Sequence, residues 1–403
     1  MSILNSKHIV LGVTGSIAAY KSAELASRLT QAGSQVDVLL TSAAEKFITP
    51  LTFQSVTGRK AFTDAELWGG EAHVLHVGLG QSADLLVIAP CTANTIAKLA
   101  YGLADNLLTI TALAMRSPIL VAPAMDAGMF EHAATQGNIE LLRKRGIHFA
   151  GPVEGHMASG LTGLGRMMEP AELIGHIRLV LGIGGKLAGR KIVVSAGGTQ
   201  EPLDPVRVLT NRSSGKQGYA IAQAAIEAGA SVVLVTTPTS LTPPAGCKVV
   251  HVRTAEEMQK AVLSEAAKAD VLVMAAAVAD FRPKGVAENK LKKRDGVPHL
   301  ELETIPDILL AVAGMGSRKP SLVVGFAAET TDLIENAASK LKTKKLDLLV
   351  ANDISAADAG FGVDENRVTL LFPDGKVESL PLMSKSEVAE ILVENIYELL
   401  ERK

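Results

Sequence analysis

Short, strongly apolar segments recur along the chain, and each leads directly into a polar loop. Three of them end in similar ways, as ADLLVIAP, ADVLVMAA and LDLLVAND, with helix-length stretches between them. No apolar run reaches the ~18 uncharged residues of a membrane span, and runs of this kind are typical of parallel strands buried on both faces. Strands that alternate with helices form βαβ units with right-handed crossovers. The sequence therefore predicts an α/β protein built on parallel sheets.

The length of the chain predicts two such sheets. A chain of 403 residues exceeds the size that one hydrophobic core usually reaches. The apolar residues, 47% of the total, are mostly Ala, Val, Leu and Ile, because aromatic residues make up only 3%. Gly182, Gly184, Gly185 and Gly189 interrupt the pattern before it restarts. We place the boundary near residue 186 and expect Rossmann-like domains at 1–185 and 186–403.

Charge and cysteine content argue against several partners and locations. A net charge of −2 gives no basic excess for nucleic acid or for a membrane surface. Residues Met1 to His8 lack the pattern of a signal peptide. Cys91 and Cys247 lie in different halves, which excludes a disulfide framework and argues against a zinc cluster. We expect a cytoplasmic protein with no nucleic-acid or membrane partner.

Hydrophobic periodicity predicts the elements of the first half. The expected strands are His8–Val13, Val36–Leu40, Leu85–Pro90 and Ile119–Pro123, and the expected helices are Ser16–Ala32, Ala93–Tyr101, Leu107–Met115, Thr135–Arg145 and Ala171–Leu181. Residues Gly151–Glu169 are rich in glycine and show little periodicity, so we expect a long loop that serves as a lid.

The second half repeats the order of strand, glycine-rich loop, helix and strand. The expected segments are Ile192–Ala196, Gly197–Gly218, Tyr219–Ala228 and Val232–Thr236. Two segments depart from the alternation. Ala279–Leu302 is rich in Lys and Arg, and Val368–Leu382 surrounds the turn Pro373-Asp374-Gly375, which predicts an antiparallel hairpin at a sheet edge. We expect a helix over Lys385–Leu400.

The loop Gly12–Lys21, between the first strand and the first helix, is a candidate phosphate site. Its small residues let backbone N–H groups approach an anion at a helix N-terminus, where Ser16 could also cap the helix. The alternative is a tight turn with a cap. Polar residues follow other strands of this half, including Ser42, Thr92 and Asn94. Ligands bind at the carboxyl ends of strands in open α/β sheets, which favours a binding site here.

His76 is the histidine of interest in the first half, in the segment HVGLG. A lone histidine more often has a structural role than a catalytic one, and composition does not separate His76 from its neighbour His73.

The second half carries a similar constellation. The segment Asn211–Gly218, NRSSGKQG, precedes a helix with the Ser, Gly and Lys that bind phosphate, although its glycine spacing is not that of a P-loop. The alternative is a capped helix in a polar loop. Asp280 ends a strand where a carboxylate could reach a metal or a base, and Lys290 lies in a run that could be a solvated charge cluster. Lys340 and Lys344, four apart, share one helix face.

Motifs of the first half resemble those of the flavin-dependent cysteine decarboxylases, and most closely the phosphopantothenoylcysteine decarboxylases. They are GVTGSIAAYK, ITPLTFQSVTG, HVGLGQSADLLVIAPCTANTIAKLAYGLADNLLT, PAM and GLTGLGRMMEP, in the order of that family. The resemblance implies a flavodoxin-like domain that binds FMN and oxidises the substrate's cysteinyl thiol to a thioaldehyde, so that CO₂ leaves before the electrons return. It implies that Gly15, Ser16, Ser42, Thr92 and Asn94 bind the cofactor, and that His76 is the catalytic histidine.

Two positions depart from that family. Asp126 stands where the motif PAMN has an amide, and Ser159 stands where the glycine-rich loop has a cysteine associated with the final reduction. A serine hydroxyl is a far weaker acid than a thiol. Three interpretations follow: a variant site with another proton donor, a reaction that stops at the enethiol, or an inactive domain. Both residues are catalytic candidates.

Motifs of the second half resemble those of the phosphopantothenate–cysteine ligases. They are AGGTQEPLDPVRVLTNRSSGKQG, AAAVADFRP, NKLKK, IPDIL, VVGFAAET and KKLDLLVANDI. The resemblance implies activation of phosphopantothenate by CTP and Mg²⁺ as an acyl-cytidylate, which the amine of cysteine then attacks. It implies roles in catalysis or nucleotide binding for Asn211, Arg207, Asp280 (also the metal candidate), Lys290, Pro306, Asp307, Ile308, Phe326, Lys340 and Lys344. Ile305 stands where the family has Asn, so the resemblance does not decide whether this loop contacts the base of the nucleotide.

The two resemblances together imply a bifunctional enzyme that ligates cysteine and then decarboxylates the product. Relatives of the flavin half imply a homo-oligomer based on trimers, often gathered into dodecamers. Two rival functions have less support. A nicotinamide-dependent reductase needs a G-x-G-x-x-G turn or a Tyr-x-x-x-Lys pair, and the sequence has neither. A flavin-binding scaffold or regulatory protein with an inactive first domain is supported only by Asp126 and Ser159.

Overall fold

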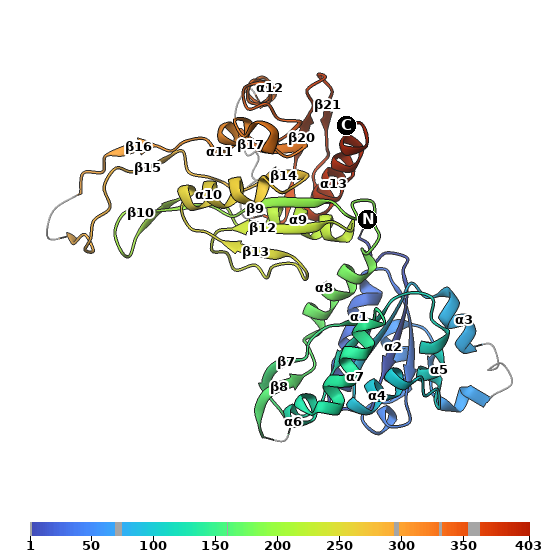
Figure 1. Ribbon diagram of the computed structural model, residues 1–403. Coiled ribbons are helices and arrows are strands. Elements are labelled where there is room, and N and C mark those ends of the chain that lie inside the picture. The colour runs from blue at the N-terminus through green and yellow to red at the C-terminus, as the bar shows by residue number, and fades with distance from the viewer. Residues whose placement is uncertain (1, 69–74, 159, 294–297, 330–332, 354–362) are drawn as a thin grey trace. The chain divides into compact units, whose positions relative to one another are not determined.

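The computed structural model describes residues 2–68, 75–158, 160–293, 298–329, 333–353 and 363–403. The chain divides into two compact units, Met1–Gly182 and Ile183–Lys403, and the division falls at the start of the glycine-rich stretch (Figure 1). Each unit has its own sheet, and each is described by itself.

The N-terminal unit is built on a six-stranded parallel sheet in the order β3-β2-β1-β4-β5-β6. The strands are β1 (His8–Val13), β2 (Gln35–Leu40), β3 (Ala61–Phe62), β4 (Leu85–Cys91), β5 (Ile119–Pro123) and β6 (His148–Phe149). The full order is that of a Rossmann sheet; without the two-residue β3 it is the flavodoxin-like order. The predicted fold class of this half is confirmed.

Helices cover both faces of this sheet, and a hydrophobic core lies on each side. The helices are α1 (Ala19–Gln31), α2 (Pro50–Thr57), α3 (Leu75–Ser82), α4 (Ala93–Tyr101), α5 (Leu107–Ala114), α6 (Ala127–Glu131), α7 (Ala133–Lys144) and α8 (Pro170–Leu181). Successive β1 residues point to opposite cores: Ile9 packs in the cluster with α1 and α8, and Val10 packs in the cluster with α4 and α5. This two-sided burial is why the strands are almost purely apolar.

The predicted long loop over Gly151–Glu169 is wrong in part. It contains an antiparallel pair, β7 (Val153–His156) and β8 (Thr162–Arg166), with His156 opposite Thr162. The hairpin lies outside the main sheet, and neither strand buries an apolar side chain, although Gly165 is buried. Periodicity could not reveal strands that bury so little apolar surface.

The C-terminal unit is built on an eight-stranded sheet in the order β13-β12-β9-β14-β17-β18-β20-β21. The strands are β9 (Lys191–Ala196), β12 (Ser231–Thr236), β13 (Lys248–His251), β14 (Val271–Met274), β17 (Leu322–Glu329), β18 (Leu348–Asp353), β20 (Val368–Leu371) and β21 (Val377–Ser379). The first six in spatial order are parallel, and β20 and β21 are antiparallel. The predicted hairpin around Pro373-Asp374-Gly375 at the sheet edge is therefore confirmed.

Helices also cover both faces of the second sheet. They are α9 (Lys216–Glu227), α10 (Ala255–Ala266), α11 (Ile308–Ala313), α12 (Leu333–Thr343) and α13 (Lys385–Glu401). The C-terminal helix α13 packs against α9, while α10, α11 and α12 contribute to a core on the other side with Met258, Ile308 and Leu341. A small pair, β19 (Glu365–Asn366) with β22 (Met383–Ser384), lies directly before α13.

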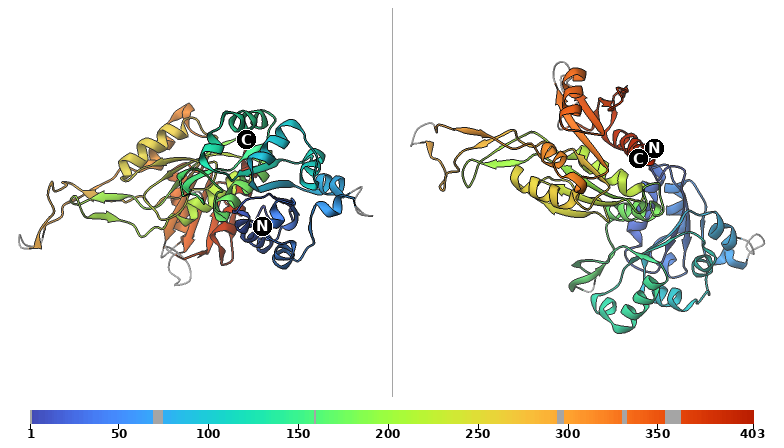
Figure 2. Two further views of the ribbon diagram at one scale, coloured as in Figure 1. Left: turned by 90° about the horizontal axis from the view of Figure 1, so that it is seen from below. Right: turned by 45° about the horizontal axis from the view of Figure 1, so that its top comes forward.

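An arm formed by two antiparallel pairs extends from this sheet, as Figures 1 and 2 show. It consists of β10 (Gln200–Pro202) with β11 (Val208–Thr210) and β15 (Phe281–Pro283) with β16 (Leu302–Thr304). The buried carboxylate of Asp204 joins the two pairs, because it accepts hydrogen bonds from the backbone N–H of Arg207 at 2.8 Å and of Leu291 at 3.1 Å. The described residues of the lysine-rich segment that interrupts the sequence pattern, 281–293 and 298–302, therefore belong to this arm.

Two predicted helix starts are wrong by a turn. Helix α1 begins at Ala19 rather than Ser16, and its N-cap is Ala18 without a side-chain bond; the hydroxyl of Ser16 accepts from the Ala18 N–H at 3.2 Å instead. Helix α9 begins at Lys216 rather than Tyr219, directly after Gly215, whose φ of 78° suits a glycine. Among the described residues, no helix combines the length and hydropathy needed to cross a membrane.

Candidate functional site

The N-terminal unit has a pocket at the carboxyl edge of its sheet. All five residues predicted to bind the flavin line it: Gly15, Ser16, Ser42, Thr92 and Asn94. They follow β1, β2 and β4, three neighbouring strands whose carboxyl ends lie at the same edge of the sheet. The cavity, about 490 Å³, is within the range of small-molecule sites.

The backbone of this pocket is fixed by hydrogen bonds between its loops. The hydroxyl of Thr14 donates to the Pro90 carbonyl at 2.8 Å and accepts from the Thr92 N–H at 3.1 Å, which joins the loops after β1 and β4. Asp64, which the sequence analysis did not single out, accepts from the N–H of Ser42 at 3.1 Å and of Leu107 at 3.0 Å. The loops are therefore held in place before any ligand binds.

The geometry at Gly15 explains why the loop needs a glycine. A Cβ at this position would lie 2.6 Å from the Cβ of Ala43. Without one, the loop after β1 lies against the loop after β2 and exposes backbone to the pocket. Thr92 caps α4, whose N-terminus faces the same cavity. Such an N-terminus with close backbone approach suits a phosphate group.

A second pocket adjoins the first and shares Ser16, Ala124 and Met125 with it. Asp126 and His156 both line it, from α6 and from the β7–β8 hairpin. Asp126 caps α6 by accepting from the Gly128 N–H at 3.0 Å. This pocket extends from the first pocket to the β7–β8 hairpin. Ser159 follows β7 in the sequence and lies outside the described residues.

A buried lysine supports this second pocket. Lys21 is 5% exposed, and its ammonium donates to the Met167 carbonyl at 3.0 Å and to Glu169 at 2.7 Å. Glu169 also accepts from Arg166 at 2.6 Å. The hydrogen bond from Lys21 is the main reason that the pKa of Glu169 is lowered. The base of the hairpin is thus tied to helix α1.

His76 does not line either pocket. It lies on α3, and its Nδ1 is buried without a hydrogen-bond partner among the described residues. Its neighbour His73 lies outside the described residues. The catalytic role of His76 therefore stays a prediction.

In the C-terminal unit, one pocket brings together most of the predicted ligase residues. It is lined by Asn211, Asp280, Pro306, Asp307, Ile308, Phe326, Lys340 and Lys344. The amide of Asn211 donates to the carbonyls of Ala277 at 3.3 Å and Val278 at 3.2 Å, in the loop after β14.

The cationic side of this pocket is formed by the end of α12. Lys344 lies one residue beyond the helix, and its N–H donates to the Lys340 carbonyl at 3.0 Å, which continues the helical turn. Its ammonium lies 2.7 Å from Asp307. Burial raises the pKa of Asp307, but the hydrogen bonds from Lys344 and the Leu310 N–H outweigh it, so the net pKa is lowered and the carboxylate stays ionised.

Two predicted ligase residues are not in this pocket. Arg207 and Lys290 both lie on the arm. The guanidinium of Arg207 donates to Asp204 at 2.9 Å through Nε and to the Leu291 carbonyl at 2.8 Å. Lys290 is exposed and adjacent to Leu291. Asp280 is also exposed, and the described residues hold no group of three acidic, His or Cys side chains that could bind a metal. Mg²⁺ often binds through one or two carboxylates and substrate phosphates, which is compatible with Asp280 alone.

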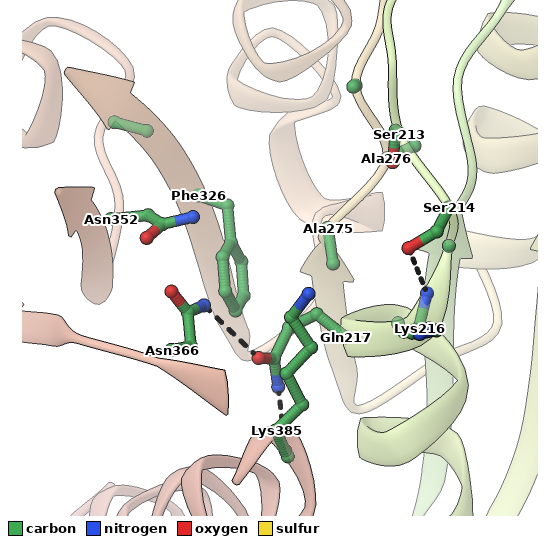
Figure 3. A pocket seen from close by; sticks show the side chains of 14 residues that line it. Ser213, Ser214, Lys216, Gln217, Ala275, Ala276, Phe326, Asn352, Asn366 and Lys385 are labelled. Atoms are coloured by element: carbon green, nitrogen blue, oxygen red, sulfur yellow. Dashed lines mark hydrogen bonds between the residues drawn. The ribbon is translucent and has the colours of Figure 1, made fainter. Parts of the chain in front are cut away.

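A further pocket adjoins the predicted nucleotide pocket, with Ala276, Ala277, Phe326 and Ala327 common to both (Figure 3). Ser213, Ser214, Lys216 and Gln217 of the NRSSGKQG segment line it at the N-terminus of α9. It is also lined by Asn352, which lies in a quoted motif but was given no role, and by two residues that the sequence analysis missed, Asn366 and Lys385. Asn352 ends the apolar run LDLLVAND, so the strand-end rule could have found it. Lys385 gave no such signal, because it belongs to a helix far along the chain.

Comparison with known proteins assigns the chain to a family. The family model described as Flavoprotein matches residues 2–181, and the model described as DNA/pantothenate metabolism flavoprotein C-terminal domain matches residues 187–400. The coenzyme A biosynthesis bifunctional protein CoaBC of Bacillus subtilis (strain 168) is 43% identical over 97% of this chain and 97% of its own length.

Two further relatives carry the same name. The bifunctional protein CoaBC of Mycobacterium tuberculosis (strain ATCC 25618 / H37Rv) is 44% identical over 97% of this chain and 96% of its own. A crystal structure of the C-terminal domain of a CoaBC protein is 41% identical, covers 55% of this chain and all of that one, and has a TM-score of 0.47. The chain therefore belongs to the family of coenzyme A biosynthesis bifunctional proteins, CoaBC, with a flavoprotein domain followed by a pantothenate-metabolism domain.

Proposed function

We propose that the chain catalyses two consecutive steps of coenzyme A biosynthesis. Residues 186–403 ligate cysteine to 4′-phosphopantothenate with CTP and Mg²⁺, and residues 1–185 decarboxylate the product to 4′-phosphopantetheine with FMN. The main support is the position of two pockets, one in each unit, at the carboxyl edge of that unit's sheet. One is lined by all five residues predicted to bind the flavin, and the other by most of the residues predicted for the ligase. Membership of the CoaBC family supports both activities.

In the ligase step, the chain's task is to neutralise charge and to align the substrate carboxylate with the α-phosphate of CTP. Lys340 and Lys344 line the pocket as cations for nucleotide phosphates, and Asn211 lies where it could orient the acyl group. Asp280 would share Mg²⁺ with the phosphates. Pyrophosphate leaves when the acyl-cytidylate forms, and CMP leaves when the amine of cysteine attacks. No protein nucleophile is needed.

In the decarboxylase step, Gly15, Ser16, Ser42, Thr92 and Asn94 would hold FMN. The bound flavin supplies a reversible two-electron oxidation of the cysteinyl sulfur–carbon unit. The adjoining pocket with Asp126 and His156 would hold the cysteinyl end of the substrate under the β7–β8 hairpin. An ionised Asp126 would repel a carboxylate, which favours loss of that group as neutral CO₂.

We further propose that the protein acts in the cytoplasm as a homo-oligomer based on trimers. Both cysteines are free, as in a reducing compartment. A monomer at micromolar concentration on a sizing column would exclude the oligomer.

The decisive experiment supplies the purified chain with phosphopantothenate, cysteine, CTP and Mg²⁺, and identifies products by mass spectrometry. Phosphopantetheine is expected. Accumulation of phosphopantothenoylcysteine would leave the ligase assignment standing and exclude an active decarboxylase. An enethiol product would assign the N-terminal unit to oxidative decarboxylation alone, which is the alternative that Asp126 and Ser159 support.

A further inference from the structure

Asp64 connects two walls of the flavin pocket, although it does not line the pocket itself. It follows the short strand β3 and is the first residue of the 3₁₀ helix η2 (Asp64–Trp68). One carboxylate oxygen, Oδ2, accepts from the Ser42 N–H at 3.1 Å, and the other, Oδ1, accepts from the Leu107 N–H at 3.0 Å. The two oxygens of one side chain therefore join the loop after β2 to the start of helix α5.

Each of these N–H groups belongs to a wall of the pocket. Ser42 and Ala43 line it on the β2 side, and Asn106, which directly precedes Leu107, lines it on the α5 side. Asn106 is the N-cap of α5, so its position depends on the first turn of that helix. A carboxylate suits this turn, because it satisfies a helix donor that has no intrahelical partner and lies at the positive end of the dipole. Asp64 thus fixes one wall relative to the other.

The loop after β2 is held from two sides. On the side of β1, the Thr41 N–H donates to the Val13 carbonyl at 3.1 Å, and Gly15 packs against Ala43. On the side of α5, the bond from Ser42 to Asp64 holds the loop. A pocket whose loops are ordered before the ligand arrives binds more tightly, because less conformational freedom is lost on binding. Release of this loop from Asp64 should therefore weaken cofactor binding.

We propose that Asp64 is a positioning residue for FMN: its two hydrogen bonds hold the loop after β2 and the start of α5 at the separation that the cofactor needs. This inference rests on the proposed flavin function of the N-terminal unit and adds to it a residue that acts from outside the pocket, through Ser42 and Leu107. Hydrogen bonds from N–H groups to an ionised carboxylate are about twice as strong as those between neutral groups, so their loss should be measurable in the affinity for FMN.

The test compares Asp64→Asn with Glu66→Gln in the full-length chain. Asparagine has nearly the same shape, but it offers one oxygen and presents N–H donors to the second partner, so one of the two bonds is lost. Glu66 is the matched control, a carboxylate of the same 3₁₀ helix that accepts from the N–H of Thr63 at 2.8 Å and from its hydroxyl at 2.9 Å. Protein stripped of flavin is titrated with FMN, and quenching of the flavin fluorescence gives Kd. We expect Asp64→Asn to raise Kd about tenfold or more, and Glu66→Gln to change it by less than about twofold.

An unchanged Kd in Asp64→Asn, or an equal rise in Glu66→Gln, would overturn the proposal. Thermal unfolding separates positioning from a purely structural role. A structural residue lowers the midpoint of the flavin-free protein but leaves the increase caused by FMN intact, whereas we expect that increase to shrink in Asp64→Asn.

If Asp64→Asn does not fold, hydrogen exchange of the wild type decides the question. FMN should slow exchange of the Leu107 amide, which does not line the pocket, and an unchanged rate there would overturn the proposal. None of these measurements requires decarboxylation. If the wild type itself binds no FMN, the flavin assignment fails, which is a separate outcome.

Discussion

At the scale of single residues, the ion-pair cluster at the amino ends of the N-terminal strands gives a pH-dependent prediction. The Nε2 of His8 lies 2.8 Å from buried Asp37, and Arg59 donates to both oxygens of Asp37 at 2.7 and 2.9 Å. The hydrogen bond to Asp37 raises the pKa of His8 above 6.5 in spite of partial burial. The stabilisation is therefore present below pH 6.5 and is lost as the pH rises through the raised folded-state value.

We expect His8→Gln to lower the free energy of unfolding by about 1.5–3 kcal/mol at pH 6 and by much less at pH 9. The single tryptophan of the chain, Trp68, belongs to the N-terminal unit, so urea unfolding followed by its fluorescence reports on that unit. His148→Gln, at a strand of the same sheet, controls for the loss of a histidine. If His8→Gln lowers the free energy of unfolding by the same amount at pH 6 and at pH 9, the ion-pair explanation is contradicted.

Gly15 gives a second prediction at this scale. Gly15→Ala would place a Cβ 2.6 Å from that of Ala43 and would push the two loops of the flavin pocket apart. We expect the purified variant to retain less than about a tenth of the wild-type flavin, since a shift of 1.4 kcal/mol in binding is tenfold. Flavin absorbance per mole of protein measures this. Gly137→Ala, on α7 with open space around the added methyl, should keep its flavin.

The residues of the sites differ in how far the sequence could reveal them. Some site residues could be predicted because they come soon after strands, and the carboxyl ends of neighbouring parallel strands meet at one edge of a sheet. These residues are Gly15, Ser42, Thr92 and Asn94. Lys385 and Asp64 act through tertiary packing, and nothing near them in the sequence marks a pocket. For Arg207 the opposite holds. The sequence motif singled the residue out, but its hydrogen-bond partners, Asp204 and Leu291, follow from the fold of the arm and could not be predicted.

At the scale of elements, a buried carboxylate makes most of the side-chain hydrogen bonds that link the two halves of the arm. Asp204 accepts from the N–H groups of Val206, Arg207 and Leu291 and from the Arg207 guanidinium, which holds the pKa of Asp204 far below its usual range. These bonds connect the β10–β11 turn to the segment that carries Lys290. The ionised carboxylate of Asp204 is therefore one of several contacts that hold the arm together, beside the bond from the Ala287 N–H to the Leu203 carbonyl at 3.1 Å.

We expect Asp204→Asn to free the segment 284–293 from the turn, because an amide offers one acceptor oxygen where the carboxylate offered two. Backbone hydrogen exchange in that segment should increase by about tenfold or more, corresponding to at least 1.4 kcal/mol of lost local stability. Glu378→Gln, which removes an exposed partner of Lys376, should leave exchange in the segment unchanged. If the backbone amides of segment 284–293 exchange in Asp204→Asn at the same rate as in the wild type, other contacts hold the arm.

The strands and helices differ in how well the sequence predicts them. The strands β1, β4 and β5 were predicted nearly to the residue, because burial on both faces leaves an unmistakable apolar run. The β7–β8 hairpin was missed, since its strands bury too little apolar surface to leave a periodic pattern. The start of α1 was placed too early, because a glycine- and serine-rich loop continues the small-residue pattern of the helix.

At the scale of the whole molecule, each unit has its own hydrophobic cores and its own pocket. The core clusters of described residues each draw on one unit alone. We therefore expect separately produced chains 1–182 and 183–403 to fold. Mixed with phosphopantothenate, cysteine, CTP and Mg²⁺, they should together form phosphopantetheine, while 183–403 alone should stop at phosphopantothenoylcysteine. Mass spectrometry distinguishes these products, and failure of the mixture where the full chain succeeds would show that the units must be joined.

The position of Lys385 also has a consequence for synthesis on the ribosome. The flavoprotein domain is complete when less than half of the chain has emerged, and N-terminal domains generally fold first. The cavity between α9 and α13 gains its buried lysine only when the last helix is translated and docks. A transcript truncated before that helix would yield a protein whose flavoprotein domain is intact but whose ligase domain, which supplies the substrate of the flavoprotein domain, is defective. The domain that is translated first therefore catalyses the second of the two chemical steps.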